Sequence, residues 1–241
     1  MVRLICAEFK KLKGSSMFWI GLGGCFILPV MALSINLSTS DSFTWIKYVT
    51  QNLWPQEILL WPCIFGVFGS FIFNRERIEN TYKNLLTIPV GRLRLAIAKL
   101  LVLLISILVM SVLTYVLNIS GVIVGVPVDF KSFIDGLWLY ILSGLLMFFS
   151  VLPVILIAVL SKKGFLLAIS VTIIYALASF LASWVSVLAP LVPTDIAWRI
   201  IGLDQFKINY AFPLQVSYAS IALISLASLI GIFTAAKKQD A

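Results

Sequence analysis

The sequence predicts an all-α integral membrane protein with six transmembrane helices, a basic amphipathic N-terminal helix and both termini in the cytoplasm. The composition, the spacing of apolar stretches and the distribution of basic residues predict this class. The 241-residue chain is 61% hydrophobic and 12% charged, with a mean hydropathy of +1.07. Soluble domains are ~45 to 50% apolar and ~25% charged. The excess apolar side chains exceed what one globular core could bury, so a bilayer must accommodate them.

Six apolar stretches have the length of membrane spans. A helix needs ~20 apolar residues to cross ~30 Å of hydrocarbon. The first stretch follows a basic segment (residues 1–16), but it exceeds the ~7 to 15 apolar residues of a signal peptide and no small-residue cleavage site follows, so we expect it to be retained. The predicted spans cover approximately residues 17–37, 58–73, 95–117, 137–160, 164–188 and 214–235. The second is short, and its start around Trp54, Pro55, Glu57 and Trp61 has the pattern of an entry at the membrane interface.

The distribution of lysine and arginine predicts the orientation, because cytoplasmic loops of membrane proteins carry an excess of these residues. With both termini inside, the cytoplasmic segments hold 14 of the 18 basic residues, and six of the ten acidic residues lie outside. The net charge of +8 therefore reflects the orientation of the chain in the plasma membrane and its contact with anionic lipid. We expect no nucleic-acid partner. The basic residues left outside are Lys47, Lys131, Arg199 and Lys207.

The residue types present exclude most catalytic chemistry. The chain has no histidine, which removes His-containing triads and HExxH zinc sites. Cys6, Cys25 and Cys63 are too far apart for a CxxC motif, and we interpret them as apolar core residues. There is no glycine-rich phosphate loop of the Walker A kind. We therefore expect no catalytic residue, metal or cofactor on this chain.

The predicted spans contain small residues in place of charges. Lys99, near the inner end of the third span, is the only charged side chain away from the predicted span ends, which argues against ion-coupled transport. Small residues repeat at i, i+4 and let helices approach closely. Two interpretations remain open: packing within one bundle, or a subunit interface or substrate path. The pairs include Gly66 with Ser70, Ala178 with Ala182, and Ala227 with Gly231.

The segment between the second and third spans, residues 74–94, has the pattern of a short amphipathic helix that Pro89 and Gly91 end. Such a helix could lie on lipid, or it could dock into a groove on a soluble partner and transmit that partner's motion. Its apolar face would hold Ile78, Tyr82, Leu85 and Leu86, and its polar flank Arg75, Glu76, Glu79 and Lys83.

This segment resembles the cytoplasmic segment of type-2 ABC transporter permeases. In that family an acidic residue, a Gly-Thr or similar pair, Leu-Leu and Pro-x-x-Arg follow one another. Here Asn80 stands where Gly is common, and Gly91 stands where Ser is common. The chain is most similar to permease subunits of lantibiotic-immunity and bacitracin-resistance exporters of Gram-positive bacteria. The residues that would couple to an ATPase are Arg75, Glu76, Glu79, Thr81, Tyr82, Leu85, Leu86, Pro89 and Arg92.

The resemblance implies a complex with two ABC ATPase subunits, which bind ATP and Mg²⁺, and a second permease that is either a copy of this chain or a different one. Closure of the ATPases on nucleotide would push on the helix around residues 79–86. The expected function is export of a lantibiotic or another peptide antibiotic from the membrane. Two alternatives are export of lipid, polysaccharide or a small drug, and a non-transporting membrane scaffold or sensor.

The outer side of the protein is where a membrane-active peptide would first arrive. The outer segment 189–213 mixes apolar and charged residues; the resemblance implies short helices dipping into the outer leaflet, and an ordinary surface loop fits its composition equally well. Aromatic residues suit the membrane interface, where they could either anchor the helices or contact the substrate. The candidate substrate contacts are Trp45, Trp54, Trp61 and Trp198.

Overall fold

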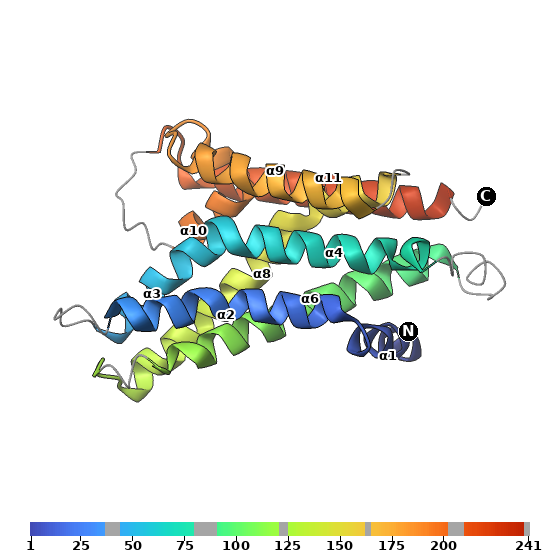
Figure 1. Cartoon of the computed structure of the whole chain (residues 1–241). Coiled ribbons are helices and arrows are strands. Elements are labelled where there is room, and N and C mark those ends of the chain that lie inside the picture. The colour runs from blue at the N-terminus through green and yellow to red at the C-terminus, as the bar shows by residue number, and fades with distance from the viewer. Residues whose placement is uncertain (37–43, 80–90, 121–124, 162–164, 202–209, 239–241) are drawn as a thin grey trace.

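The computed structural model describes residues 1–36, 44–79, 91–120, 125–161, 165–201 and 210–238, and every regular element in these ranges is helical. The long helices run side by side as one bundle, and both termini lie at the same end of it (Figure 1). The helices are α1 (Val2–Lys13), α2 (Ser16–Asn36), α3 (Trp45–Pro55), η1 (Gln56–Leu60), α4 (Trp61–Ile78), α6 (Arg92–Asn118), α8 (Phe130–Leu160), α9 (Phe165–Ser183), η2 (Ala189–Leu191), α10 (Pro193–Ile201) and α11 (Leu214–Lys238).

The central element is α8, which contacts α3, α4, α6, α9, α10 and α11. Asp129 caps its N-terminus by accepting a hydrogen bond from the backbone N–H of Ser132 (3.4 Å). Apolar residues on one broad face of α8 are fully enclosed, including Met147, Val151, Leu152 and Ile155. A helix that is apolar all round packs stably inside such a bundle.

The second predicted span is longer in the structure than in the sequence-based prediction. Residues 58–73 were expected to form a short span with an interfacial entry, whereas α3, η1 and α4 form one 32-residue candidate span from Trp45 to Glu76. The element η1 between them is a π-helical turn. Pro55 and Pro62 flank this turn and lack the backbone N–H that an α-helical ladder needs, which favours a local change of helix type.

At the N-terminus, α1 and the first part of α2 meet at an angle of 77°. The described residues contain five helices long and apolar enough to cross a membrane, or six if this bent pair is counted as one span. The remaining predicted spans correspond closely to helices, since α6, α8, α9 and α11 each cover most or all of the expected range. The all-helical fold class and the multi-pass architecture are confirmed.

Small residues allow close helix packing within this bundle. A Cβ added at Gly66 on α4 would lie 2.5 Å from Thr172 Cγ2 on α9, and one added at Gly231 on α11 would lie 2.7 Å from Leu156 on α8. Both glycines therefore serve packing inside the chain. Ala178 on α9, from another of the predicted pairs, is exposed.

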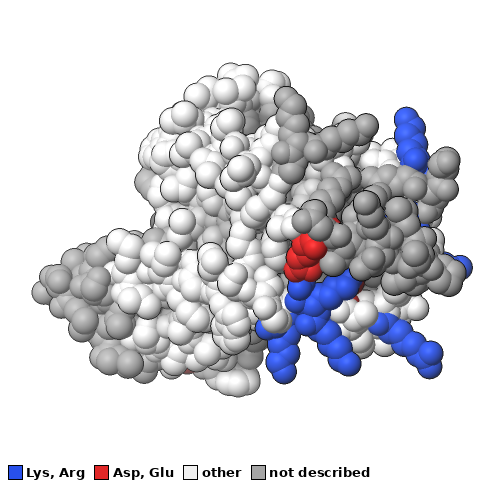
Figure 2. Space-filling view, turned by 45° about the vertical axis from the view of Figure 1, so that its right-hand side comes forward, with Lys and Arg blue, Asp and Glu red and all other residues white. Residues whose placement is uncertain are grey.

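The outer faces of α9 and α11 are strongly apolar. Exposed side chains that would contact lipid include Leu166, Ile174 and Leu181 on α9, and Leu223, Leu226 and Ile230 on α11. Charged side chains gather instead at one end of the bundle, where Figure 2 shows lysine and arginine around a small acidic area while most other atoms in this view are uncharged. Exposed basic residues of this end are Arg3, Lys10, Lys13, Arg94, Lys237 and Lys238.

Candidate functional site

The predicted ATPase-coupling residues begin at the charged end of the bundle. Arg75 and Glu76 belong to the last turn of α4, which continues directly from the span. Glu79 follows that helix, and its backbone N–H donates to the Arg75 carbonyl (2.9 Å). Arg92 begins α6 and is buried. The remaining predicted residues, Thr81, Tyr82, Leu85, Leu86 and Pro89, lie outside the described residues.

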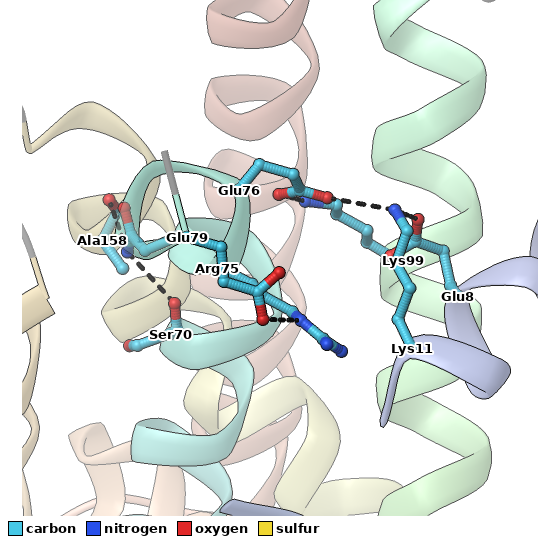
Figure 3. Close-up of polar contacts among 9 residues, drawn as sticks. Glu8, Lys11, Ser70, Arg75, Glu76, Glu79, Lys99 and Ala158 are labelled. Carbon is cyan, nitrogen blue, oxygen red and sulfur yellow. Dashed lines mark hydrogen bonds and ion pairs between the residues drawn. The ribbon is translucent and has the colours of Figure 1, made fainter. Parts of the chain in front are cut away.

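An ionic network centred on Glu76 joins three helices at this end. The Lys99 Nζ on α6 donates to Glu76 Oε2 (2.5 Å), and the Lys11 Nζ on α1 donates to Glu76 Oε1 (3.4 Å). Lys11 also pairs with Glu8 on its own helix (2.5 Å). Figure 3 shows these side chains converging from α1, α4 and α6. Glu76 and Lys99 are both buried, with side chains 7% and 6% exposed, so water screens their attraction only weakly.

Neighbouring side chains fix the end of α4 on its other sides. The Asn74 Nδ2 donates to the Ser70 carbonyl (3.1 Å) and to the Ala158 carbonyl of α8 (3.3 Å). The Arg75 Nε donates to Glu79 Oε1 (2.7 Å), in a more exposed pair. The last turns of α4 are thus attached to α1, α6 and α8, so a displacement of this turn would be passed to all three helices. The arrangement suits mechanical coupling.

At the opposite end, most of the predicted substrate-contacting tryptophans are core residues. Trp45, Trp61 and Trp198 are at most 3% exposed. The Trp45 Nε1 donates to the Tyr115 hydroxyl (3.2 Å), and the Trp61 ring lies edge-on to Tyr140, with 6.0 Å between ring centroids. These three rings do not line the surface of the chain, which corrects the expectation of an exposed aromatic belt. The reason is that α3, α4 and α10, which hold these three residues, pack against α8 and carry the rings inward.

Trp54 is the one of the four that is partly exposed, and its ring lies edge-on to that of Trp184 after α9 (6.4 Å between centroids). The aromatic pair joins the α3 end of the bundle to the end of α9.

A buried polar network in the same half of the bundle was not anticipated from the sequence. The Asn52 Nδ2 of α3 donates to Asn118 Oδ1 of α6 (2.9 Å), and the Asn118 Nδ2 donates to the Tyr140 hydroxyl of α8 (2.9 Å). The Tyr140 hydroxyl in turn lies 3.5 Å from the Val49 carbonyl. These bonds connect three helices by buried polar groups, which fixes their relative register.

Glu57, which was expected at the membrane interface, is enclosed by the protein. It lies in the π-helical turn η1 with no exposed surface, and neither carboxylate oxygen has a hydrogen-bond partner among the described residues. The Asp195 carboxyl of α10 is close enough to repel a negative charge on Glu57. Pro55, two residues before Glu57, was the available sequence signal, because a proline interrupts the α-helical ladder and favours a local change of helix type.

Asp195 lies in α10, which is not among the candidate membrane spans. Burial raises the pKa of its carboxyl to about 7. The outer segment that contains it is a packed helix in its first part, because Arg199 holds α10 against α11 by donating to Ser217 Oγ (2.8 Å) and to the Phe212 carbonyl (2.7 Å). The Arg199 guanidinium also lies 4.2 Å from the centroid of the Tyr210 ring.

A helical multi-pass bundle with a braced charged end is compatible with the membrane subunit of a transporter, and the comparisons with known proteins show that class. The family model described as ABC-2 family transporter protein matches residues 4–179. The chain belongs to this family of ABC transporter permeases. It is also 33% identical, over 185 residues, to the bacitracin transport permease protein BCRB of Bacillus licheniformis; the match covers 76% of this chain and 86% of that protein.

Membership of the family makes the chain a transport subunit and not itself an enzyme, and permeases of this family normally work with an ATPase subunit. The matched residues include α1, the Glu76 network and Glu57. They end within α9, so α10 and Asp195 lie beyond them.

Proposed function

We propose that this chain is the permease subunit of an ATP-driven exporter that removes a peptide antibiotic, bacitracin or a lantibiotic, from the membrane and so protects the cell. The observation that carries the proposal is the 33% identity to a bacitracin transport permease over most of both chains. In this proposal ATP and Mg²⁺ bind two copies of a partner ATPase. The second permease is a copy of this chain or a different one, and the charged end of the bundle faces the cytoplasm.

The Glu76 network supports the proposed coupling. A partner that pushes on residues 79–86 would act directly beyond the last turn of α4, where Glu76 contacts α1 and α6. Buried ion pairs and the Asn74 bonds make this turn stiff, so displacement would reach the bundle with little loss. An exposed and loosely held α4 end would absorb the same motion.

Resistance in cells tests the proposal. Expression of the chain with its ATPase, and with any second permease, in a sensitive Gram-positive host should raise the inhibitory concentration of bacitracin or of a lantibiotic. An ATPase variant that cannot hydrolyse ATP should abolish the gain. If no peptide of this kind were tolerated better while a lipid, polysaccharide or small drug stimulated ATP hydrolysis by the purified complex, the cargo assignment would be rejected in favour of that alternative.

Copurification tests the docking segment separately. Replacing Leu85 and Leu86 together by Asp should leave membrane insertion unchanged and reduce recovery of the ATPase, since charges would enter a desolvated groove. If the Leu85 and Leu86 variant recovered as much ATPase as the wild type, the docking interpretation would be rejected and the segment would be interpreted as an interfacial helix on lipid.

A further inference from the structure

A groove at the bend between α1 and α2 combines an apolar wall with a basic rim. Its volume is about 290 Å³ and it lies between α1, α2 and α6. The groove is lined by Phe9, Leu12, Lys13, Phe18, Trp19, Ser106 and Val109. The Ser106 hydroxyl donates to the Val102 carbonyl of its own helix (2.8 Å), and Lys13 is the charged residue among those that line the groove.

The charges around the groove favour an anion at its rim. The last turn of α1 contains Lys10, Lys11 and Lys13, and its first turn contains no acidic residue. Lys11 turns inward to Glu8 and Glu76, whereas Lys10 and Lys13 are exposed. The positive N-terminal end of the 21-residue helix α2 begins three residues after Lys13 and adds to this field.

The bend has open space beside the lysine. A Cβ added at Gly14 would meet no atom within 4 Å. Trp19 and Val109, which form part of the wall, are 65% and 47% exposed, so the groove opens sideways toward the surroundings of the bundle. In a membrane protein those surroundings are lipid, and α1 lies at the end of the bundle where the headgroups would be (Figure 1).

We propose that this groove binds an anionic phospholipid, with an acyl chain along Phe9, Phe18 and Val109 and the headgroup phosphate at Lys13. The bound lipid would hold α1 against α2 and α6, beside the Lys11 to Glu76 bond that connects α1 to α4. A second groove, of about 220 Å³, lies between α2 and α4 and is lined by apolar and small residues, Cys63 among them, with no charged side chain. It offers no comparable selection of a headgroup.

Native mass spectrometry of the purified chain in a mild detergent tests this proposal without the ATPase. The probes are palmitoyl-oleoyl phosphatidylglycerol, which is anionic, and palmitoyl-oleoyl phosphatidylcholine, which has no net charge. We expect the wild type to retain several times more of the anionic lipid. Lys13→Gln should weaken its retention about fivefold, the factor that one lysine near an anionic surface contributes, and leave phosphatidylcholine unchanged.

Four further variants separate this site from general electrostatic attraction. Lys10→Gln removes an exposed lysine of the same helix that does not line the groove, and Lys131→Gln removes one at the other end of the bundle. Both should retain the anionic lipid like the wild type. Val109→Phe should fill the groove and reduce retention, whereas Cys63→Phe, in the second groove, should not. Equal retention of the two lipids by the wild type, or equal losses in all three lysine variants, would overturn the proposal.

Discussion

Buried carboxyl groups have basic partners at one end of this bundle and lack them, among the described residues, at the other. At the charged end, Glu76 lies between Lys11 and Lys99, and each lysine donates a hydrogen bond to it. At the other end, Glu57 and the Asp195 Oδ2 have no such partner among the described residues. Removal of one member of a buried pair leaves the other charge uncompensated, whereas a buried carboxyl without a basic partner favours its neutral form.

The first prediction concerns the Glu76 to Lys99 pair. Glu76→Gln should lower the free energy of unfolding by about 3 kcal/mol, because Lys99 would remain buried without a counter-charge. Thermal unfolding of the detergent-solubilised chain measures the effect. Adding Lys99→Met to Glu76→Gln should recover much of the loss. Glu79→Gln, which breaks the more exposed pair with Arg75, should cost below about 1 kcal/mol. Equal losses for Glu76→Gln and Glu79→Gln would contradict a special role for the buried pair.

The second prediction is the pH dependence due to Asp195. Its pKa is about 7 in the folded protein and ~3.9 in an unfolded chain, so the native state keeps a proton that the unfolded state releases. The resulting stabilisation is complete below pH ~4 and is lost as the pH rises to about 7. Asp195→Asn cannot titrate. Its stability relative to the wild type should therefore increase between pH 5 and pH 8, by about 2 kcal/mol.

Melting temperatures of both proteins across this pH range measure the Asp195 effect. Asp135→Asn, an exposed carboxyl on α8, is the matched control and should follow the wild type. Parallel curves for Asp195→Asn and the wild type would mean that the Asp195 carboxyl is ionised in the fold at neutral pH.

At the scale of helices, periodicity and length were sufficient to predict most of the structure. Predicted spans and observed helices agree within a few residues for α2 and α6, because an apolar run of bilayer length has few alternatives to a helix. The second span was underestimated because Trp54, Pro55 and Glu57 look like an interfacial entry. Only the packing of α3 and η1 against α8 and α9 shows that this polar stretch is enclosed.

The candidate site could be predicted only in part, because a sequence pattern indicates local structure and does not indicate contacts between distant residues. A local pattern in residues 74–94 predicts a coupling segment, which stays a prediction. The contact of Glu76 with α1 is long-range and has no local signature. The positions of the tryptophans were predicted wrongly for another reason. An aromatic residue near a span end is equally compatible with the membrane interface and with the protein core. Trp45 and Trp61 became core residues because Tyr115 and Tyr140 offer ring faces and hydroxyls on neighbouring helices.

The third prediction tests helix packing through Gly66. Gly66→Ala should lower stability by about 1 to 3 kcal/mol, because the new methyl group would overlap Thr172 Cγ2 and separate α4 from α9. Thr172→Ser removes that methyl group and keeps the hydroxyl that donates to the Ala168 carbonyl, so the double variant should unfold near the wild-type temperature. Gly23→Ala on α2, where a Cβ meets nothing within 4 Å, should be neutral or slightly stabilising. A similar loss from Gly23→Ala would indicate a backbone effect instead of packing.

Considered as a whole, the molecule is polarised along the bundle axis. The termini and most of the exposed basic residues that the structure describes lie at one end, whereas the start of α3 and the start of α8, with the exposed Lys47 and Lys131, lie at the other (Figure 1). Because basic residues are retained on the cytoplasmic side, this polarity predicts which end faces the cytoplasm. The docking of an ATPase at residues 79–86 depends on that orientation, so topology is the prediction on which the coupling proposal rests.

The fourth prediction is therefore that the charged end is cytoplasmic in intact cells. Cys6 is the exposed native cysteine, so the experiment starts from Cys6→Ser. A membrane-impermeant maleimide should label Lys131→Cys, at the start of α8, from outside the cell. It should label Lys237→Cys, at the end of α11, only after the membrane is permeabilised. Both lysines are exposed, so protection by the fold would not explain a difference. Labelling of Lys237→Cys in intact cells would place the Glu76 network outside and remove the ATPase from its reach.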